Sequence, residues 1–134
     1  MKKFNMQWII LFASFFLSNT VLAYPLPVTR YGDEGSLYIE SSSIVRMNSF
    51  IRMTYVINFW QPQSFGSHTY LSKATTVRVD CKNRRVFALS NSFYSQQNMG
   101  GDFLGKFPQD DIDGQYAEPG SWVANMVKVG CSFG

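Results

Sequence analysis

The chain contains two cysteines, Cys81 and Cys131, and both follow an N-terminal export signal. In an exported protein, a lone cysteine pair is most simply one disulfide. The bond would close a loop of roughly 50 residues, which contributes about 4 kcal/mol when treated as lost chain entropy. That is a large share of the stability of a small domain. The pair therefore predicts an exported fold whose middle is tied to its last residues.

Residues 1–23 have the composition of a secretory signal peptide. Lys2 and Lys3 supply the charge, and an apolar run over 6–17 precedes a small-residue cleavage site that ends at Ala23. The run is shorter than the roughly 20 residues needed to cross a bilayer. We therefore expect cleavage and a mature chain without a transmembrane segment, in the periplasm, secreted or at the cell surface. No cysteine lies near the cleavage site, so we expect no lipoprotein anchor.

The rest of the chain is long enough for one small domain. We expect residues 24–35, which include two prolines, to form an extended lead-in, and residues 36–134 to form the domain. The formal net charge is +3, but Lys2 and Lys3 belong to the signal, so the remainder is close to neutral. This balance argues against nucleic acid as a partner.

Alternating apolar residues predict long β-strands. Apolar side chains occupy every second position from Ile51 to Phe59, and Phe87, Leu89 and Phe93 are expected to share one face of a later strand. The predicted strands are 36–40, 50–60, 69–81, 85–95 and, less regularly, 102–107. The predicted connections are a helical turn over 44–47, a loop over 61–67, a hairpin turn over 82–84 favoured by Asn83, a turn over 98–101 and a polar segment over 108–120.

The end of the chain is predicted to be helical. Ser121 is a good N-cap for a helix from Trp122 to about Val129, and its apolar residues fall near one stripe. A helix this short needs to dock on other structure, and Cys131 would tether it to the end of the strand that carries Cys81. The sequence thus predicts an α+β fold: an antiparallel β-sheet meander with a C-terminal helix packed on one face and one disulfide.

Four short segments, in order, carry a family pattern. They are Leu37-Tyr38-Ile39-Glu40 with Ser43-Ile44 and Arg46; Tyr70-Leu71-Ser72-Lys73 leading to Val79-Asp80-Cys81; Phe93-Tyr94-Ser95 followed by Gly100; and Glu118-Pro119-Gly120-Ser121 before a helix that ends at Cys131. On these segments the chain resembles the surface-adhesin protein E family of small exported bacterial proteins. The resemblance implies a small antiparallel sheet with a helix, and adhesion to host extracellular-matrix and plasma proteins such as vitronectin, laminin or plasminogen.

The residue types give no sign of catalysis or of a cofactor. His68 lies in a polar stretch with no carboxylate in the sequence pattern to orient it. Neither Cys81 nor Cys131 is expected to be a nucleophile, because a disulfide between them is the simpler role for both. The acidic stretch 110–114 lacks the charge count and the final glutamate of a calcium loop, where Gly120 stands instead. We therefore expect no enzyme, no cofactor and no metal site.

Four cationic residues gather around the predicted hairpin turn: Arg78, Lys82, Arg84 and Arg85. We call this set the basic hairpin end. It is the candidate ligand contact, because clustered positive charge attracts acidic protein surfaces or sulfated glycans. The alternative is a charged turn that keeps a sheet edge soluble.

The leading hypothesis is an exported, non-enzymatic binding protein with a protein partner, as the family resemblance implies. A soluble periplasmic interaction protein, an inhibitor or immunity partner without an adhesin role, is the alternative. A homodimer formed through a sheet edge also stays open.

Overall fold

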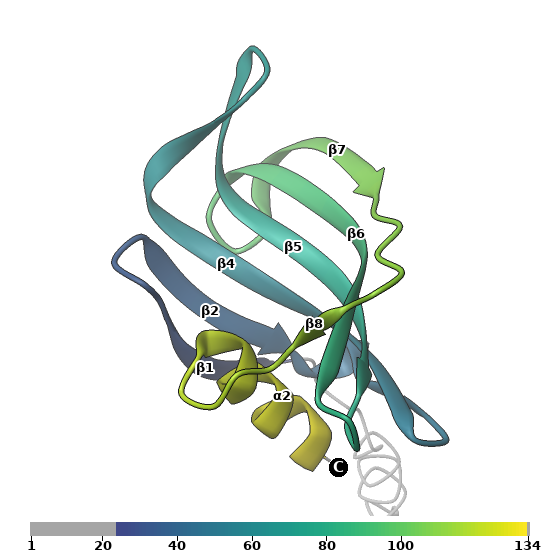
Figure 1. Ribbon diagram of the computed structural model, residues 1–134. Coiled ribbons are helices and arrows are strands. Elements are labelled where there is room, and N and C mark those ends of the chain that lie inside the picture. The colour runs from purple at the N-terminus through teal and green to yellow at the C-terminus, as the bar shows by residue number, and fades with distance from the viewer. Residues whose placement is uncertain (1–23, 134) are drawn as a thin grey trace, which may run out of the picture.

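A computed structural model describes residues 24–133, so the expected signal peptide lies outside the described residues (Figure 1). The elements in chain order are β1 (Pro25–Tyr31), β2 (Gly35–Glu40), the 3-10 turn η2 (Ser41–Ser43), β3 (Val45–Met47), β4 (Phe50–Phe65), β5 (His68–Asp80), β6 (Arg85–Gln96), β7 (Gly100–Pro108), β8 (Gln115–Tyr116) and α2 (Trp122–Ser132).

The strands form one antiparallel sheet in the order β1-β2-β4-β5-β6-β7. The short strand β3 pairs with β4, and the two-residue strand β8 pairs with β6. Figure 1 shows a curled sheet in which the β4–β5 hairpin rises above the other strands and α2 lies beside β1. The predicted antiparallel meander with a C-terminal helix is confirmed.

The stretch expected to be an extended lead-in is part of the sheet. Pro25 to Tyr31 forms β1, which pairs with β2 and has an irregularity between Pro27 and Thr29. Proline lacks a backbone donor and is tolerated on an edge strand. The turn to β2 includes Gly32, whose φ of +53° suits glycine.

The predicted helical turn over 44–47 is wrong. Only Ser41–Ser43 is helical, and Val45–Met47 pairs with β4 as strand β3. The Ser43 hydroxyl does not cap a helix. Its Oγ accepts a hydrogen bond from the Thr54 backbone N–H of β4 at 2.8 Å. This bond fixes the turn against β4.

The predicted loop over 61–67 is also wrong. Strand β4 continues to Phe65, and the true turn is at Gly66, with a φ of +58°. The pairing with β5 is interrupted between Asn58 and Gln63, and Pro62 lies inside that interruption. Proline has no backbone N–H to donate to a neighbouring strand. Because the ladder is interrupted by a bulge at Pro62, no such hydrogen bond is required there, and the strand can continue past the proline.

A second bulge changes which faces the β6 side chains occupy. Thr76 pairs with Ser90 and Val77 with Ala88, so Leu89 is the extra residue. As a result Phe87 lies opposite Arg78, while Phe93 lies opposite Lys73 on the other face. The expectation that Phe87, Leu89 and Phe93 share one face is therefore wrong.

The core is built largely from β4 and α2. The alternating residues predicted for β4, from Ile51 to Phe59, are all buried. Val123, Met126 and Val127 of α2 belong to the same cluster of buried side chains. Trp122 contacts both Tyr31 and Tyr55, with ring centroids 5.2 and 5.8 Å apart.

Three side chains stabilise α2 or join it to the sheet. Ser121 Oγ accepts a hydrogen bond from the Ala124 N–H at 3.1 Å, so the predicted N-cap is confirmed. Cys131 lies within the last turn of α2 and forms the predicted disulfide with Cys81, with Cα atoms 6.0 Å apart. Arg46 Nη2 donates to the Cys131 and Phe133 carbonyls at 2.8 and 3.0 Å. The side chain thereby satisfies carbonyls that the helix end leaves free.

Candidate functional site

The basic hairpin end lies at one end of the sheet, where β5 turns into β6 across residues 81–84. The predicted hairpin turn is confirmed, but Asn83 is not its left-handed residue. Arg84 has the positive φ of +57°. Asn83 instead donates its side-chain and backbone N–H groups to the Asp80 carboxylate at 2.8 and 3.1 Å. These bonds lower the pKa of Asp80, which keeps the carboxylate ionised beside the basic residues.

Arg78 is the most firmly placed of the four cations. Its guanidinium lies over the rings of Phe50 and Phe87, 5.0 and 4.7 Å from their centroids. Arg78 is exposed, and its direct partner on β4 is Arg52, which is exposed too. Directly opposed residues of an antiparallel pair point to the same face. The ring contacts therefore hold Arg78 beside a second arginine, Arg52, which is not one of the four residues of the basic hairpin end.

The other three basic residues point in different directions. Lys82 is exposed in the turn. Arg85 Nη1 donates to the Asp113 carbonyl at 3.2 Å, and Arg85 is opposite Asp80. Arg84 is half-buried and lines a hollow of about 410 Å³ against α2. The structure thus brings Arg52, Arg78 and Arg85 to one face and directs Arg84 toward the helix.

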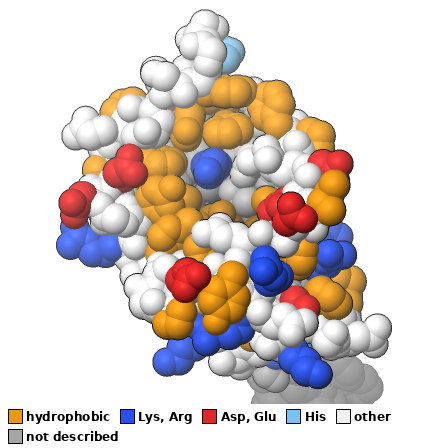
Figure 2. Space-filling view, viewed as in Figure 1, with side chains coloured by type: hydrophobic (Ala, Val, Ile, Leu, Met, Phe, Trp, Pro, Cys, Tyr) orange, Lys and Arg blue, Asp and Glu red, His pale blue; other side chains and the backbone are white. Residues whose placement is uncertain are grey.

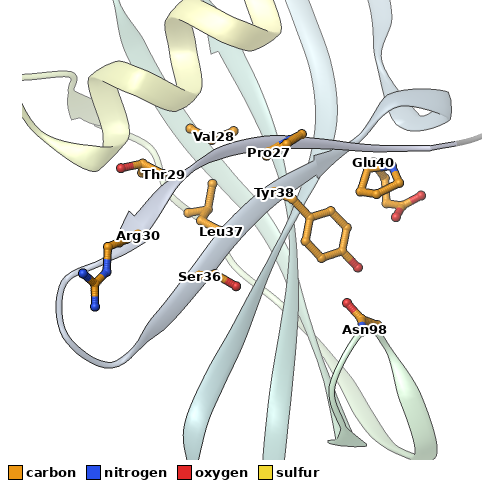
Figure 3. Close-up of a pocket in the computed structure, with 10 residues that line it drawn as sticks. Pro27, Val28, Thr29, Arg30, Ser36, Leu37, Tyr38, Glu40 and Asn98 are labelled. Carbon is orange, nitrogen blue, oxygen red and sulfur yellow. The ribbon is translucent and has the colours of Figure 1, made fainter.

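A larger hollow lies along β1 and β2, with a volume of about 730 Å³. Figure 3 shows Tyr38 and Asn98 pointing toward the same space beneath these strands. Burial, and then Glu40, raise the pKa of Tyr38 to about 12, so its phenol is neutral and can donate a hydrogen bond. Pro25 and Pro27 form part of the lining. No sequence pattern indicated this hollow, because it depends on β1 being a strand.

Of the other residues considered for chemistry, Cys81 and Cys131 line the same hollow as Arg84. His68 is the exposed first residue of β5. Cys81 and Cys131 are bonded to each other. Over residues 24–133 there is no cluster of three or more His, Cys, Asp or Glu side chains that could hold a metal ion. Within that same range, no helix has the length and apolar character to span a membrane.

The chain is similar to one protein family and to several solved structures. A family profile described as surface-adhesin protein E matches residues 26–132. Similar solved structures include Haemophilus influenzae protein E, with a TM-score of 0.64 and 16% identity over 86% of this chain and 90% of that one. Protein E from non-typeable Haemophilus influenzae has a TM-score of 0.61 and 15% identity, covering 84% of this chain and 78% of that one. No curated protein matches the sequence.

Proposed function

Because this chain belongs to the surface-adhesin protein E family, we propose that it is an exported, non-enzymatic protein that binds host extracellular-matrix or plasma proteins. Export is supported by residues 1–23, whose composition is typical of a cleaved signal peptide. The disulfide also supports export, since such bonds persist outside the reducing cytosol.

The observation that carries the binding proposal is the pair of exposed arginines, Arg52 and Arg78, on adjacent strands. Two like charges side by side repel each other and are retained at some cost in stability. An acidic partner would relieve that repulsion. The rings of Phe50 and Phe87 hold the Arg78 guanidinium in place, so less side-chain freedom is lost on binding.

The two faces of the sheet have different roles in this proposal: one is covered by α2, and the other meets the protein partner. We infer that α2 covers the face that carries Ile51 and Met53. Support comes from the close approach at Gly130, where an added Cβ would lie 2.5 Å from Met53 Sδ and 3.3 Å from Ile51 Cδ1. Arg52 alternates with these residues and so belongs to the opposite face. That face is the one proposed to meet the protein partner.

Removing charge from the basic hairpin end should weaken binding. We expect Arg78→Gln combined with Lys82→Gln to lower the affinity of the purified protein for its matrix or plasma partner by about threefold to tenfold, as expected for two exposed charge contacts. Surface plasmon resonance against a panel of such proteins would measure this. Affinity should also fall as salt is raised, because exposed charges are screened.

The matched control is Lys128→Gln, which removes one charge from an exposed position on α2, outside the face that carries Arg52 and Arg78, and is compared with Arg78→Gln alone. An equal loss in Arg78→Gln and Lys128→Gln would show that only net charge matters. Absence of binding to every matrix and plasma protein tested, or binding insensitive to salt, would contradict the proposal.

A soluble periplasmic interaction protein is the second candidate. The observation in its favour is that both cysteines are joined to each other, because this bond forms in the periplasm as readily as at a surface. Cell fractionation separates the two candidates. For an adhesin we expect the protein to be cleaved by protease added to intact cells. Protection on intact cells, with release alongside periplasmic markers, would favour the inhibitor or immunity partner.

A further inference from the structure

A continuous row of aromatic rings runs along the sheet on the face that carries Tyr55 and Ile57. Neighbouring rings have centroids between 4.8 and 6.0 Å apart, in the order Tyr55, Trp122, Tyr31, Phe59, Tyr70 and Phe93. Phe65 stacks on Phe93 at 4.7 Å and contacts Phe107 at 5.1 Å, which extends the row toward β7. We call these rings the aromatic row.

Lys73 lies on the same face as the aromatic row. It is opposite Ile57 on β4 and Phe93 on β6, and directly opposed residues share a face. The next residue of β5 on this face, Thr75, pairs with Tyr55 and donates its hydroxyl to Asn91 Oδ1 at 2.7 Å. Figure 2 shows hydrophobic side chains gathered around a recessed Lys or Arg side chain on the upper part of the molecule.

Burial lowers the pKa of Lys73, and no carboxylate among residues 24–133 provides a counter-charge for its ammonium. An ammonium removed from water without a partner is costly, and an anion brought to it recovers part of the loss. The charge of this face therefore favours a ligand with a negatively charged end.

The surface around Lys73 favours a ligand whose remaining part is apolar. The face of a sheet presents side chains, because its backbone N–H and C=O groups bond to neighbouring strands. A peptide laid across the aromatic row would bury amide groups without partners, which is unfavourable. A hydrocarbon chain has no such groups and gains from contact with the rings.

The charge of the ligand head is limited to one. Lys73 supplies a single point charge and lacks the forked donors with which arginine binds phosphate. Burial, and then Tyr31 and Glu34, raise the pKa of the Tyr70 phenol, so this member of the aromatic row stays neutral and adds no charge beside Lys73.

We propose that the face around Lys73 binds a monocarboxylate with a long hydrocarbon chain, of the fatty-acid type. The carboxylate contacts the Lys73 ammonium, and the chain follows the half-buried part of the aromatic row, which consists of Tyr70, Phe93 and Phe65. Tyr55 and Phe59 belong to the buried core and do not contact the ligand. This site is independent of the basic hairpin end, because Arg78 lies on the opposite face of β5.

Calorimetric titration of the purified protein with laurate, kept below its micelle concentration, tests the site. We expect Lys73→Met, which keeps the apolar stem and removes the charge, to weaken laurate binding by at least about tenfold, as for a lost bond to a charged group. Dodecanol has the same chain and no charge, so its affinity should be unchanged by this substitution. Lys106→Met removes an exposed lysine from β7 and should leave laurate binding unchanged.

If Lys73→Met does not fold, the affinities of the unaltered protein for laurate and for dodecanol can be compared instead. Laurate should then bind at least about tenfold more tightly than dodecanol, because only laurate can pair with the ammonium. Failure of laurate to bind, equal affinity for laurate and dodecanol, or equal laurate binding by the Lys73→Met protein would each overturn the proposal. Tighter binding of dodecyl phosphate than of laurate would overturn the monocarboxylate assignment.

Discussion

Replacing both Cys81 and Cys131 by serine should lower the free energy of unfolding by about 4 kcal/mol, because the bond closes a loop across a separation of 50 residues. Without it, the unfolded chain regains the freedom that the cross-link removes. For a domain of this size, the loss corresponds to a fall in Tm of roughly 15 °C or more. Urea unfolding and thermal melting of the oxidised protein and of the double variant would measure it.

Reduction of the unaltered protein is the matched control. A reducing agent should produce the same loss of stability as the double substitution, and it should have no effect on the double variant. Equal stability of the oxidised protein and the double variant would show that the bond does not hold the fold together.

Truncating Ile51 to alanine should lower the free energy of unfolding by about 3 kcal/mol, within the range for buried large-to-small changes. Ile51 is fully buried, is opposite Val79 on β5 and Arg46 on β3, and approaches Gly130 of α2. Its loss would leave a cavity between three strands and the helix. Urea unfolding at constant pH is the measurement.

Arg52→Ala is the control for Ile51→Ala, since its side chain is the exposed neighbour on the same strand. We expect a change within about 0.5 kcal/mol. A loss below about 1 kcal/mol for Ile51→Ala would mean that the helix and strands are not closely packed there. Because Ile51 and the disulfide both act on α2, their effects should not be additive when combined.

Much of the fold could be predicted, because burial on one face leaves a period-two pattern. This pattern identified β4 from Ile51 to Phe59, and capping chemistry identified Ser121. The errors have local causes. Pro62 suggested a loop, although the ladder is interrupted there and proline is tolerated. The extra residue at Leu89 left no sign, because a bulge shifts side chains between faces without changing composition.

The candidate site was predictable only in part. Nearness in the sequence identified Arg78 and the turn residues that follow it. It could not join Arg52 to this set, because Arg52 comes from another strand and is adjacent to Arg78 only through the β4–β5 register. Lys73 was missed for the same reason. A lysine in a strand is usually taken as solvent-exposed, and only the register places it among aromatic rings.

The order of strands in the sheet bears on how the protein matures. Most neighbouring strands in the sheet are also neighbours in the chain, so their pairing closes short loops and does not depend on segments that come later in the chain. The cysteine of α2 comes after every strand. The disulfide between Cys81 and Cys131 therefore cannot form before α2 is present, so it covalently fixes a sheet whose strands can already have paired.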